Sequence, residues 1–221
     1  MLERLKRDVC EACITLNRAF PLLIKMSSVS ALDRDSGYIV TMPKDADYLS
    51  IRPADMLVVD QRGYLIEGAL RPMSDVLTHT MIYKSFPNVG SVVHCCSQWA
   101  TIWAQAGRDI PVYGTTHANY FHGAIPCTRK LNMFETSERY EENIGQVITE
   151  TYANSSITQT PAVLVRSHGP YVFGSSPMEA VFLASMLEEV AKMAYYTEKL
   201  GNSSPIGADL IDRHFYSNHE I

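Results

Sequence analysis

The 221-residue sequence predicts an α/β protein of the α+β kind, with a central, mainly antiparallel sheet covered by helices. Short apolar runs separated by turn signals, such as Asp35-Ser36-Gly37, follow one another closely between residues 22 and 67. Such spacing indicates hairpins rather than a doubly wound parallel sheet. Segments with helical spacing of apolar residues stand before, between and after these runs, which is typical of helices covering a sheet. Since no linker, repeat or low-complexity tract interrupts the chain, we expect residues 1–221 to form a single domain.

The elements can be placed in order from their periodicity and their end signals. Apolar runs between turn residues predict strands over 22–26, 29–32, 38–42, 56–59, 64–67, 91–96 and 162–165. Apolar residues at helical spacing, bounded by caps or breakers, predict helices over 2–20, 75–84, 98–106, 144–152, 177–200 and 209–216. Ser97 and Ser176 stand at two of the helix starts, and Gly107 and Gly201 at the corresponding ends.

Composition excludes several classes of function. Hydrophobic residues make up 46% and charged residues 19% of the chain, which is ordinary for a globular protein. A net charge of −5 without a basic run argues against a nucleic-acid partner. The charged N-terminal segment is no signal peptide, and no apolar run is long enough to span a membrane. Five cysteines, an odd number, favour reduced thiols and a cytoplasmic location.

The strongest chemical signal lies at the end of the strand predicted over 91–96. Residues two apart on a strand share a face, so His94 and Cys96 would project together while Cys95 faces the other way. An imidazole beside a thiol is half of a zinc site. The alternative is that these two residues are buried and merely pack.

Two further residues could converge on this pair. His168 follows the buried strand at 162–165, and Asp75 stands at the head of a helix. Two imidazoles and a thiolate leave one position of a tetrahedral zinc open, as in catalytic sites, and Asp75 could complete the ligand set or act as a base. Each has a simpler explanation, because His168 could be a core histidine and Asp75 a helix cap.

Several motifs together resemble the L-ribulose-5-phosphate 4-epimerases of the class II aldolase superfamily. They are Met73-Ser74-Asp75, Ala104-Gln105-Ala106-Gly107, Gly114-Thr115-Thr116-His117-Ala118-Asn119-Tyr120-Phe121, Ile125-Pro126-Cys127-Thr128-Arg129-Lys130, Ser167-His168-Gly169-Pro170 and Leu187-Glu188-Glu189-Val190-Ala191. The resemblance extends from Leu2 to about His214. It implies a C4 homotetramer with active sites between subunits. It also implies a divalent metal, usually zinc, that polarises a ketose carbonyl during carbon–carbon cleavage.

The resemblance also implies roles for individual residues. Metal ligands would be His94, Cys96, His168 and Asp75, and catalytic groups would be Asp75, Asn119 and His214, the last reaching across the subunit interface. Substrate would be bound by Ser27, Ser28, Lys44, Ser74, Thr115 and Glu141.

This chain departs from the family pattern at several of these positions. Cys96 replaces a histidine, and Asn119 replaces the catalytic aspartate although an amide transfers no proton. The family's C-terminal tyrosine has no counterpart. Met42 stands where the family has a lysine, so Lys44 would have to supply the phosphate-binding charge.

These departures favour a metal-dependent aldol-type lyase or epimerase, diverged from the 4-epimerases and acting through a metal-bound enediolate or enolate. Its substrate would be a small hydroxy-carbonyl compound, sugar or sugar-like, that need not be phosphorylated. Two alternatives remain, a working sugar-phosphate epimerase and a non-catalytic homo-oligomeric scaffold like the adducin branch of the superfamily. Because Asp75, His94 and His168 all persist, an enzyme is favoured over the scaffold. No nucleic-acid or membrane partner is expected.

Overall fold

A computed structural model describes residues 2–21, 24–44, 46–48 and 50–219. Seven strands in this part of the chain form one sheet in the order β4-β3-β2-β1-β5-β7-β6. Every neighbouring pair is antiparallel. The strands are β1 (Ser28–Leu32), β2 (Ile39–Thr41), β3 (Leu57–Val59), β4 (Leu65–Glu67), β5 (Ser91–His94), β6 (Ala162–Val165) and β7 (Gly169–Gly174). The predicted fold class is therefore confirmed.

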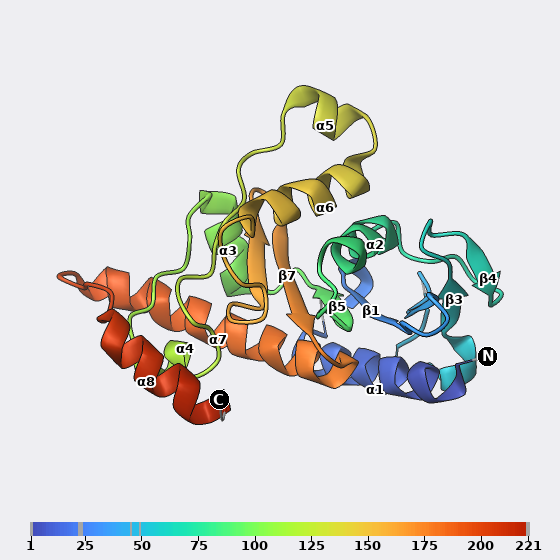
Figure 1. Cartoon of the computed structure of the whole chain (residues 1–221), viewed down its shortest axis with the longest axis horizontal. Coiled ribbons are helices and arrows are strands. Elements are labelled where there is room, and N and C mark those ends of the chain that lie inside the picture. The colour runs from blue at the N-terminus through green and yellow to red at the C-terminus, as the bar shows by residue number, and fades with distance from the viewer. Residues whose placement is uncertain (1, 22–23, 45, 49, 220–221) are drawn as a thin grey trace.

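Helices cover both faces of the sheet (Figure 1). The first face carries α1 (Glu3–Ala19), α3 (Gln98–Ala106) and α7 (Pro177–Leu200), and the second carries α2 (Val76–Ser85) and α6 (Tyr140–Thr151). Three more helices lie outside these layers: α4 (Thr115–Ala118), α5 (Met133–Ser137) and α8 (Ala208–His219). In Figure 1, α5 rises above α6, and α8 lies beside α4 at one end of the molecule.

The alternation of side chains along the strands decides where polar groups meet. On β5, Val93 packs with the α1–α7 core, whereas Val92 packs with the α2–α6 core. His94 is two residues from Val92 and so faces α2 and α6. On β1, Val29 packs with the α1–α7 core, which turns Ser28 and its alternate neighbours toward α2. A group of polar side chains is thus enclosed between the sheet and α2.

Most predicted elements are present, with two clear differences. The strand predicted over 22–26 is wrong where the structure describes it, since Ile24–Met26 is a 3-10 helix, and its first two residues lie outside the described part. The strand predicted over 91–96 ends at His94, because the chain must leave the sheet there to reach Ser97 and start α3. β7, α4 and α5 were not predicted.

The C-terminal helix α8 packs against its own chain. Its buried residue Phe215 is only 2% exposed, and α8 contacts α4. This segment is therefore packed on its own chain as well as carrying His214, which the resemblance assigns to a neighbouring subunit's site. None of the helices in the described residues is long and apolar enough to cross a membrane.

Candidate active site

His94 is the last residue of β5 and is held in a fixed orientation. Its Nδ1–H donates to the carbonyl of Pro170 at 3.0 Å, and its ring stacks on Tyr171 at 4.4 Å between centroids and 17° between planes. Both partners belong to β7, which pairs with β5. This arrangement leaves Nε2 with a free lone pair, since the described residues offer it no hydrogen bond. Such a second-sphere contact is typical of metal-binding histidines.

His168 lies in the turn between β6 and β7, next to His94. The two imidazoles stack at 4.8 Å with an interplanar angle of 22°. Burial, reinforced by the neighbouring His94, lowers the pKa of His168 to about 4, although Asp75 acts in the opposite direction. At neutral pH the ring is therefore uncharged. It has a lone pair for a metal or a proton.

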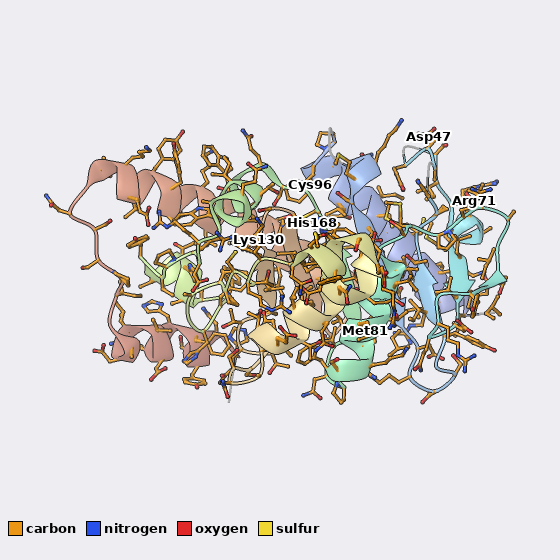
Figure 2. The ribbon with its side chains drawn as sticks, turned by 90° about the horizontal axis from the view of Figure 1, so that it is seen from above. Asp47, Arg71, Met81, Cys96, Lys130 and His168 are labelled. Carbon is orange, nitrogen blue, oxygen red and sulfur yellow. The ribbon has the colours of Figure 1, made fainter. Side chains whose placement is uncertain are left out.

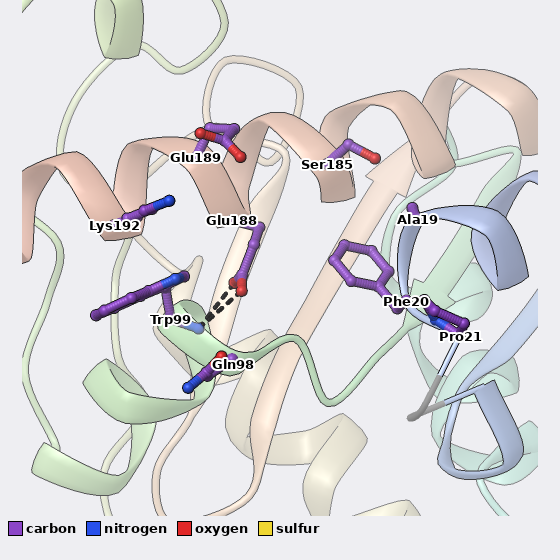
Figure 3. A pocket seen from close by; sticks show the side chains of 9 residues that line it. All are labelled: Ala19, Phe20, Pro21, Gln98, Trp99, Ser185, Glu188, Glu189 and Lys192. Atoms are coloured by element: carbon purple, nitrogen blue, oxygen red, sulfur yellow. Dashed lines mark hydrogen bonds between the residues drawn. The ribbon is translucent and has the colours of Figure 1, made fainter.

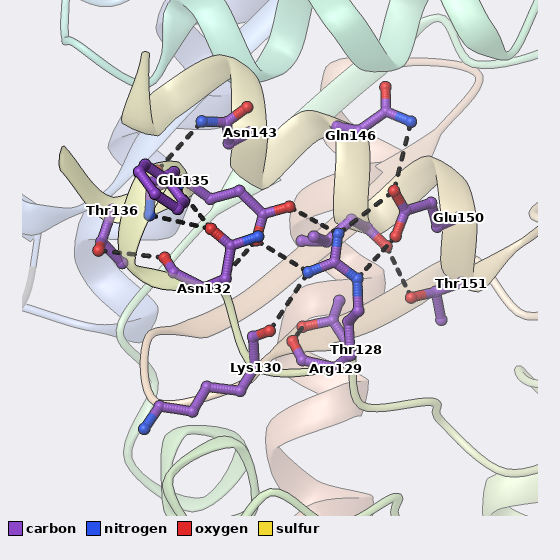
Figure 4. A network of polar contacts seen from close by, with 12 residues as sticks. Thr128, Arg129, Lys130, Asn132, Glu135, Thr136, Asn143, Gln146, Glu150 and Thr151 are labelled. Carbon is purple, nitrogen blue, oxygen red and sulfur yellow. Dashed lines mark hydrogen bonds and ion pairs between the residues drawn. The ribbon is translucent and has the colours of Figure 1, made fainter. Parts of the chain in front are cut away.

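Tyr140, the first residue of α6, reaches the same place from another part of the chain. Its hydroxyl lies 3.2 Å from Nδ1 of His168. The segment that contains α5 is held against α6 by Arg129. The guanidinium of Arg129 forms ion pairs with Glu135 at 2.7 Å and with Glu150 at 2.8 Å (Figure 4). Tyr140 was not among the predicted site residues, since a contact across 28 positions leaves no local pattern.

Asp75 precedes α2, yet its side chain does not cap the helix. One carboxylate oxygen, Oδ2, accepts a hydrogen bond from the hydroxyl of Ser28. The other, Oδ1, is buried without a hydrogen-bond partner among the described residues, and the residue as a whole is only 7% exposed. The alternative of a simple helix cap is therefore not supported. A buried carboxylate oxygen without a partner is unusual unless it serves a ligand or the chemistry.

Cys96 lies in the loop after β5, not on the strand itself. Its thiol contacts the carbonyl of Met26 at 3.7 Å and is half-buried. Burial raises the pKa of Cys96, and the charge of Asp75 raises it further. The prediction that Cys96 lies on the same strand as His94 is wrong, since β5 ends at His94. Cys96 and His168 are both labelled in Figure 2.

The donor atoms are of the chemical types that bind a divalent metal, but they are not arranged around one common point. His94 Nε2 and Asp75 Oδ1 are the two atoms whose own surroundings leave them free for a ligand. Among the residues the structure describes, however, no group of three His, Cys, Asp or Glu side chains could hold a metal ion. The stacked rings of His94 and His168 explain part of this result, because the lone pairs of two nearly parallel imidazoles do not converge on one point.

The predicted substrate-binding residues have different surroundings. Ser27 and Ser28 are fully buried, and the Ser28 hydroxyl is already engaged with Asp75. Lys44 and Ser74 are exposed. The backbone N–H of Lys44 donates to the carbonyl of Arg71 at 2.8 Å, which makes the exposed Arg71 a neighbouring cation that sequence reasoning missed.

Glu141 lies one residue after Tyr140, at the start of α6. Burial raises the pKa of its carboxyl group. The hydroxyl of Thr78, on α2, donates to the backbone carbonyl of Glu141 at 2.6 Å. Glu141 thus lies where α6 meets α2, on the side of the sheet that His94 faces.

The remaining predicted residues form a second group, at α4 and α8. Nδ1 of His214 lies 3.0 Å from Oδ1 of Asn119, and Thr115 begins the short helix that Asn119 follows. Figure 1 shows α4 and α8 at the end of the molecule, away from β5. Within one chain, then, the structure joins Asn119 to His214 but does not join this pair to His94 and Asp75.

Comparison with known proteins defines the family. A family model described as Class II Aldolase and Adducin N-terminal domain matches residues 7–195. The chain belongs to this family. Solved structures with the same fold include an L-fuculose 1-phosphate aldolase, which is 17% identical with a TM-score of 0.81 and covers 99% of this chain and 97% of its own.

Two further solved structures resemble the chain over most of its length. YgbL from Klebsiella pneumoniae is 23% identical with a TM-score of 0.72, covering 96% of this chain and 99% of its own. An L-fuculose-1-phosphate aldolase from Thermus thermophilus is 17% identical with a TM-score of 0.67, covering 92% of this chain and 99% of its own. At these identities the likeness establishes the fold. The predicted closeness to the 4-epimerases in particular stays a prediction.

Proposed function

We propose that this family member is an aldolase-type carbon–carbon lyase that acts on a small hydroxy-carbonyl compound, sugar or sugar-like. The observation that carries the proposal is the buried carboxylate of Asp75, whose Oδ1 has no partner among the described residues. It belongs to the same polar group as the two stacked, neutral imidazoles of His94 and His168. Asp75, His94 and His168 are the residues that the family resemblance assigns to catalysis and metal binding.

Two side chains of this protein are candidates for the two proton transfers of aldol cleavage. Aldol cleavage removes a proton from the hydroxyl group that becomes the aldehyde and returns a proton to the carbon that carried the broken bond. The free Oδ1 of Asp75 is suited to accept the first proton. The hydroxyl of Tyr140, 3.2 Å from His168, is a candidate donor for the return step.

A divalent metal, most plainly zinc, would be held by His94, His168 and Cys96 once the His168 ring has turned out of its stack on His94. When bound, it would polarise the substrate carbonyl as a Lewis acid, while Asp75 would act as the base rather than as a ligand. Cys96 would first have to turn away from the carbonyl of Met26. A thiolate donates more charge to zinc than an imidazole, so the metal would be a weaker Lewis acid than in relatives with three histidines.

Cleavage is favoured over epimerisation by the chemistry of Asn119. Inversion at one carbon requires a proton-transfer group on each face of the aldehyde, and an amide cannot serve as one. The substrate class is supported by the L-fuculose 1-phosphate aldolases of the same fold. If the substrate is phosphorylated, Lys44 and Arg71 are the exposed cations that would bind the phosphate.

We further propose a homotetramer in which the Asn119–His214 pair of one chain completes the site of a neighbour. The proposal is supported by the family resemblance and by the position of that pair at the end of the molecule away from β5 (Figure 1). The mass in solution tests it, and a strictly monomeric protein would contradict it.

The function is tested by incubating the purified protein with zinc or manganese and with ketoses, phosphorylated and unphosphorylated, while NMR detects the released aldehyde. We expect cleavage and about one bound zinc per chain. Cys96→Ser should lower the zinc affinity at least about tenfold, because a hydroxyl does not ionise to replace the thiolate.

The matched control for this variant is Cys127→Ser, which alters another half-buried free thiol. It should leave zinc binding unchanged. A protein that binds no zinc at neutral pH and cleaves none of the ketoses would favour the scaffold alternative instead.

A further inference from the structure

A line of buried hydrogen bonds runs from Asp75 into the protein between α2 and β1. It forms because side chains on one face of a helix lie opposite side chains on one face of a strand. Asp75, His79 and Tyr83 are spaced four apart and lie on one face of the α2 segment, while Ser28 and Ser30 are spaced two apart on one face of β1. All five side chains are buried. The helix therefore presents three polar groups to two hydroxyls on the strand.

The contacts are continuous along this line. The hydroxyl of Ser28 donates to Oδ2 of Asp75. The same hydroxyl oxygen lies 3.2 Å from Nε2 of His79, and Nδ1 of His79 lies 2.7 Å from the hydroxyl of Ser30. The hydroxyl of Ser30 in turn lies 2.8 Å from that of Tyr83.

The charge of Asp75 and a neutral ring at His79 together fix the direction of every bond in the line. A carboxylate only accepts, so Ser28 must donate its proton to Asp75 and must accept one from Nε2–H of His79. His79 then carries its proton on Nε2, and its Nδ1 accepts from Ser30. Ser30 in turn accepts from Tyr83. Every donor points toward the carboxylate, and such chains polarise and strengthen one another.

We propose that His79 is a positioning residue that, through Ser28, holds Asp75 with Oδ2 occupied and Oδ1 free. The role of Oδ1 as proton acceptor rests on the proposed lyase function, whereas the hydrogen-bond line itself does not. The side chain of His79 is fully buried, and its Nε2 is 3.8 Å from Oδ2 of Asp75, too far for a direct hydrogen bond. It therefore acts through the hydroxyl of Ser28.

The surroundings of His79 support an uncharged ring. It is fully buried, and its ring meets the edge of Tyr171 at 6.0 Å between centroids. A doubly protonated ring would donate from Nδ1 to Ser30 and would reverse the bonds at Ser30 and Tyr83, so the direction described above belongs to the neutral ring.

The first experiment needs no activity. Nitrogen-15 NMR of the imidazoles in the purified metal-free protein, with His79 assigned from the missing signals of His79→Gln, should show the Nε2–H tautomer at neutral pH. Ser28→Ala should shift the His79 signals toward a mixture of tautomers. Ser91→Ala is the matched control, since Ser91 is equally buried, lies on β5 and donates at 2.7 Å to the backbone carbonyl of Ser30 and to no side chain of the line. An Nδ1–H tautomer, a charged ring, or equal effects of the two variants would overturn the proposal.

The second experiment measures cleavage by the same variants. Ser28→Ala should lower kcat about 10- to 100-fold, the usual effect of removing an outer-shell partner, with KM changed little. Ser91→Ala should retain kcat within about threefold. Equal kcat values for the two variants would overturn the positioning role. A wild-type protein with no lyase activity would instead refute the proposed function. The tautomer of His79 measured by NMR would then be the test of whether the hydrogen-bond line exists as described.

Discussion

The group around Asp75 and the pair at α4 and α8 are built in different ways. Ser28, Asp75 and His94 are buried and lie on or beside sheet strands and α2, and each is fixed by hydrogen bonds or ring stacking. Asn119 and His214 are partly exposed, and one 3.0 Å contact joins them. α4, which positions Asn119, has only four residues.

This difference indicates which half of the proposed site is complete within one chain. A sheet with helices on both faces fixes side chains to the precision that proton transfer needs. A one-turn helix has little internal hydrogen bonding and takes its position from whatever packs on it. The position of the α4–α8 pair therefore depends more on its packing partners than that of the group around Asp75 does.

The sharpest test of this contrast is to remove the charge from the buried group. Asp75→Asn should lower the rate of cleavage about 10²- to 10⁴-fold, because the amide cannot accept a proton. Asp212→Asn is the control at the other end, where Asp212 pairs with His122 at 2.6 Å and is half exposed. It should change the rate by less than about threefold. Similar losses in both variants would contradict the difference between the two regions.

Acid should destabilise both regions, because each contains a buried neutral histidine. Burial lowers the pKa of His117 and of His168 to about 4. Between pH 6.5 and 4 the unfolded chain binds a proton at these positions and the folded chain does not, so stability is complete above pH 6.5 and falls toward pH 4. For His117 this loss amounts to at most about 3 kcal/mol.

Urea unfolding at about pH 7 and about pH 4.5 measures this loss. His117→Asn should show a smaller difference between the two pH values than the unmodified chain does. Free energies of unfolding that are equal at both pH values would show that these histidines are protonated in the folded protein.

A smaller effect is expected at the α4–α8 contact. His214→Ala removes the hydrogen bond to Asn119, which is partly exposed, and should cost about 1 kcal/mol or less. Hydrogen exchange of the α8 amides should quicken, while that of β5 stays as it is. The control Asn218→Ala, at an exposed position of α8, should leave exchange unchanged. Faster exchange throughout the sheet would mean that the two regions are not independent.

The smallest change is expected from Asn119→Asp. Restoring one carboxylate leaves the opposite face of the aldehyde without an acid, so turnover of L-ribulose 5-phosphate should rise less than about tenfold and remain low. An assay with zinc or manganese checks this for both proteins. Rates of about 1–10³ per second in the unmodified protein would instead support the working epimerase.

Most of the fold could be predicted because its elements have local signals. The periodicity of α1, the cap at Ser176 and the turns between the early strands all lie within a few residues of the elements that they define. β7 was missed because its run over 169–174 begins with Gly-Pro, a turn signal, although it pairs along β5 and β6. Its pairing with β6 is a local hairpin in which Val165 lies opposite Gly169, whereas its pairing with β5 is long-range.

The site was less predictable for the same reason. His94, His168 and Asp75 follow or precede apolar runs, and the structure places them near one another. Tyr140 contacts His168 from a different part of the chain, and the spacing of apolar residues in the sequence gives no sign of this contact. His79 could have been found, since it stands four residues after Asp75 on the same helical face.

Glu188 gives one more consequence of this architecture, and it concerns the order of folding. Its carboxylate, on α7, accepts the backbone N–H groups of Trp99 and Ala100 and so caps α3 (Figure 3). The hydroxyl of Ser97, next to that helix in sequence, provides no cap. The cap therefore comes from 89 residues away, and the first turn of α3 is completed only after α7 has docked. During synthesis from the N-terminus, the loop that carries Cys96 should thus reach its final form late, once almost the whole chain has been made.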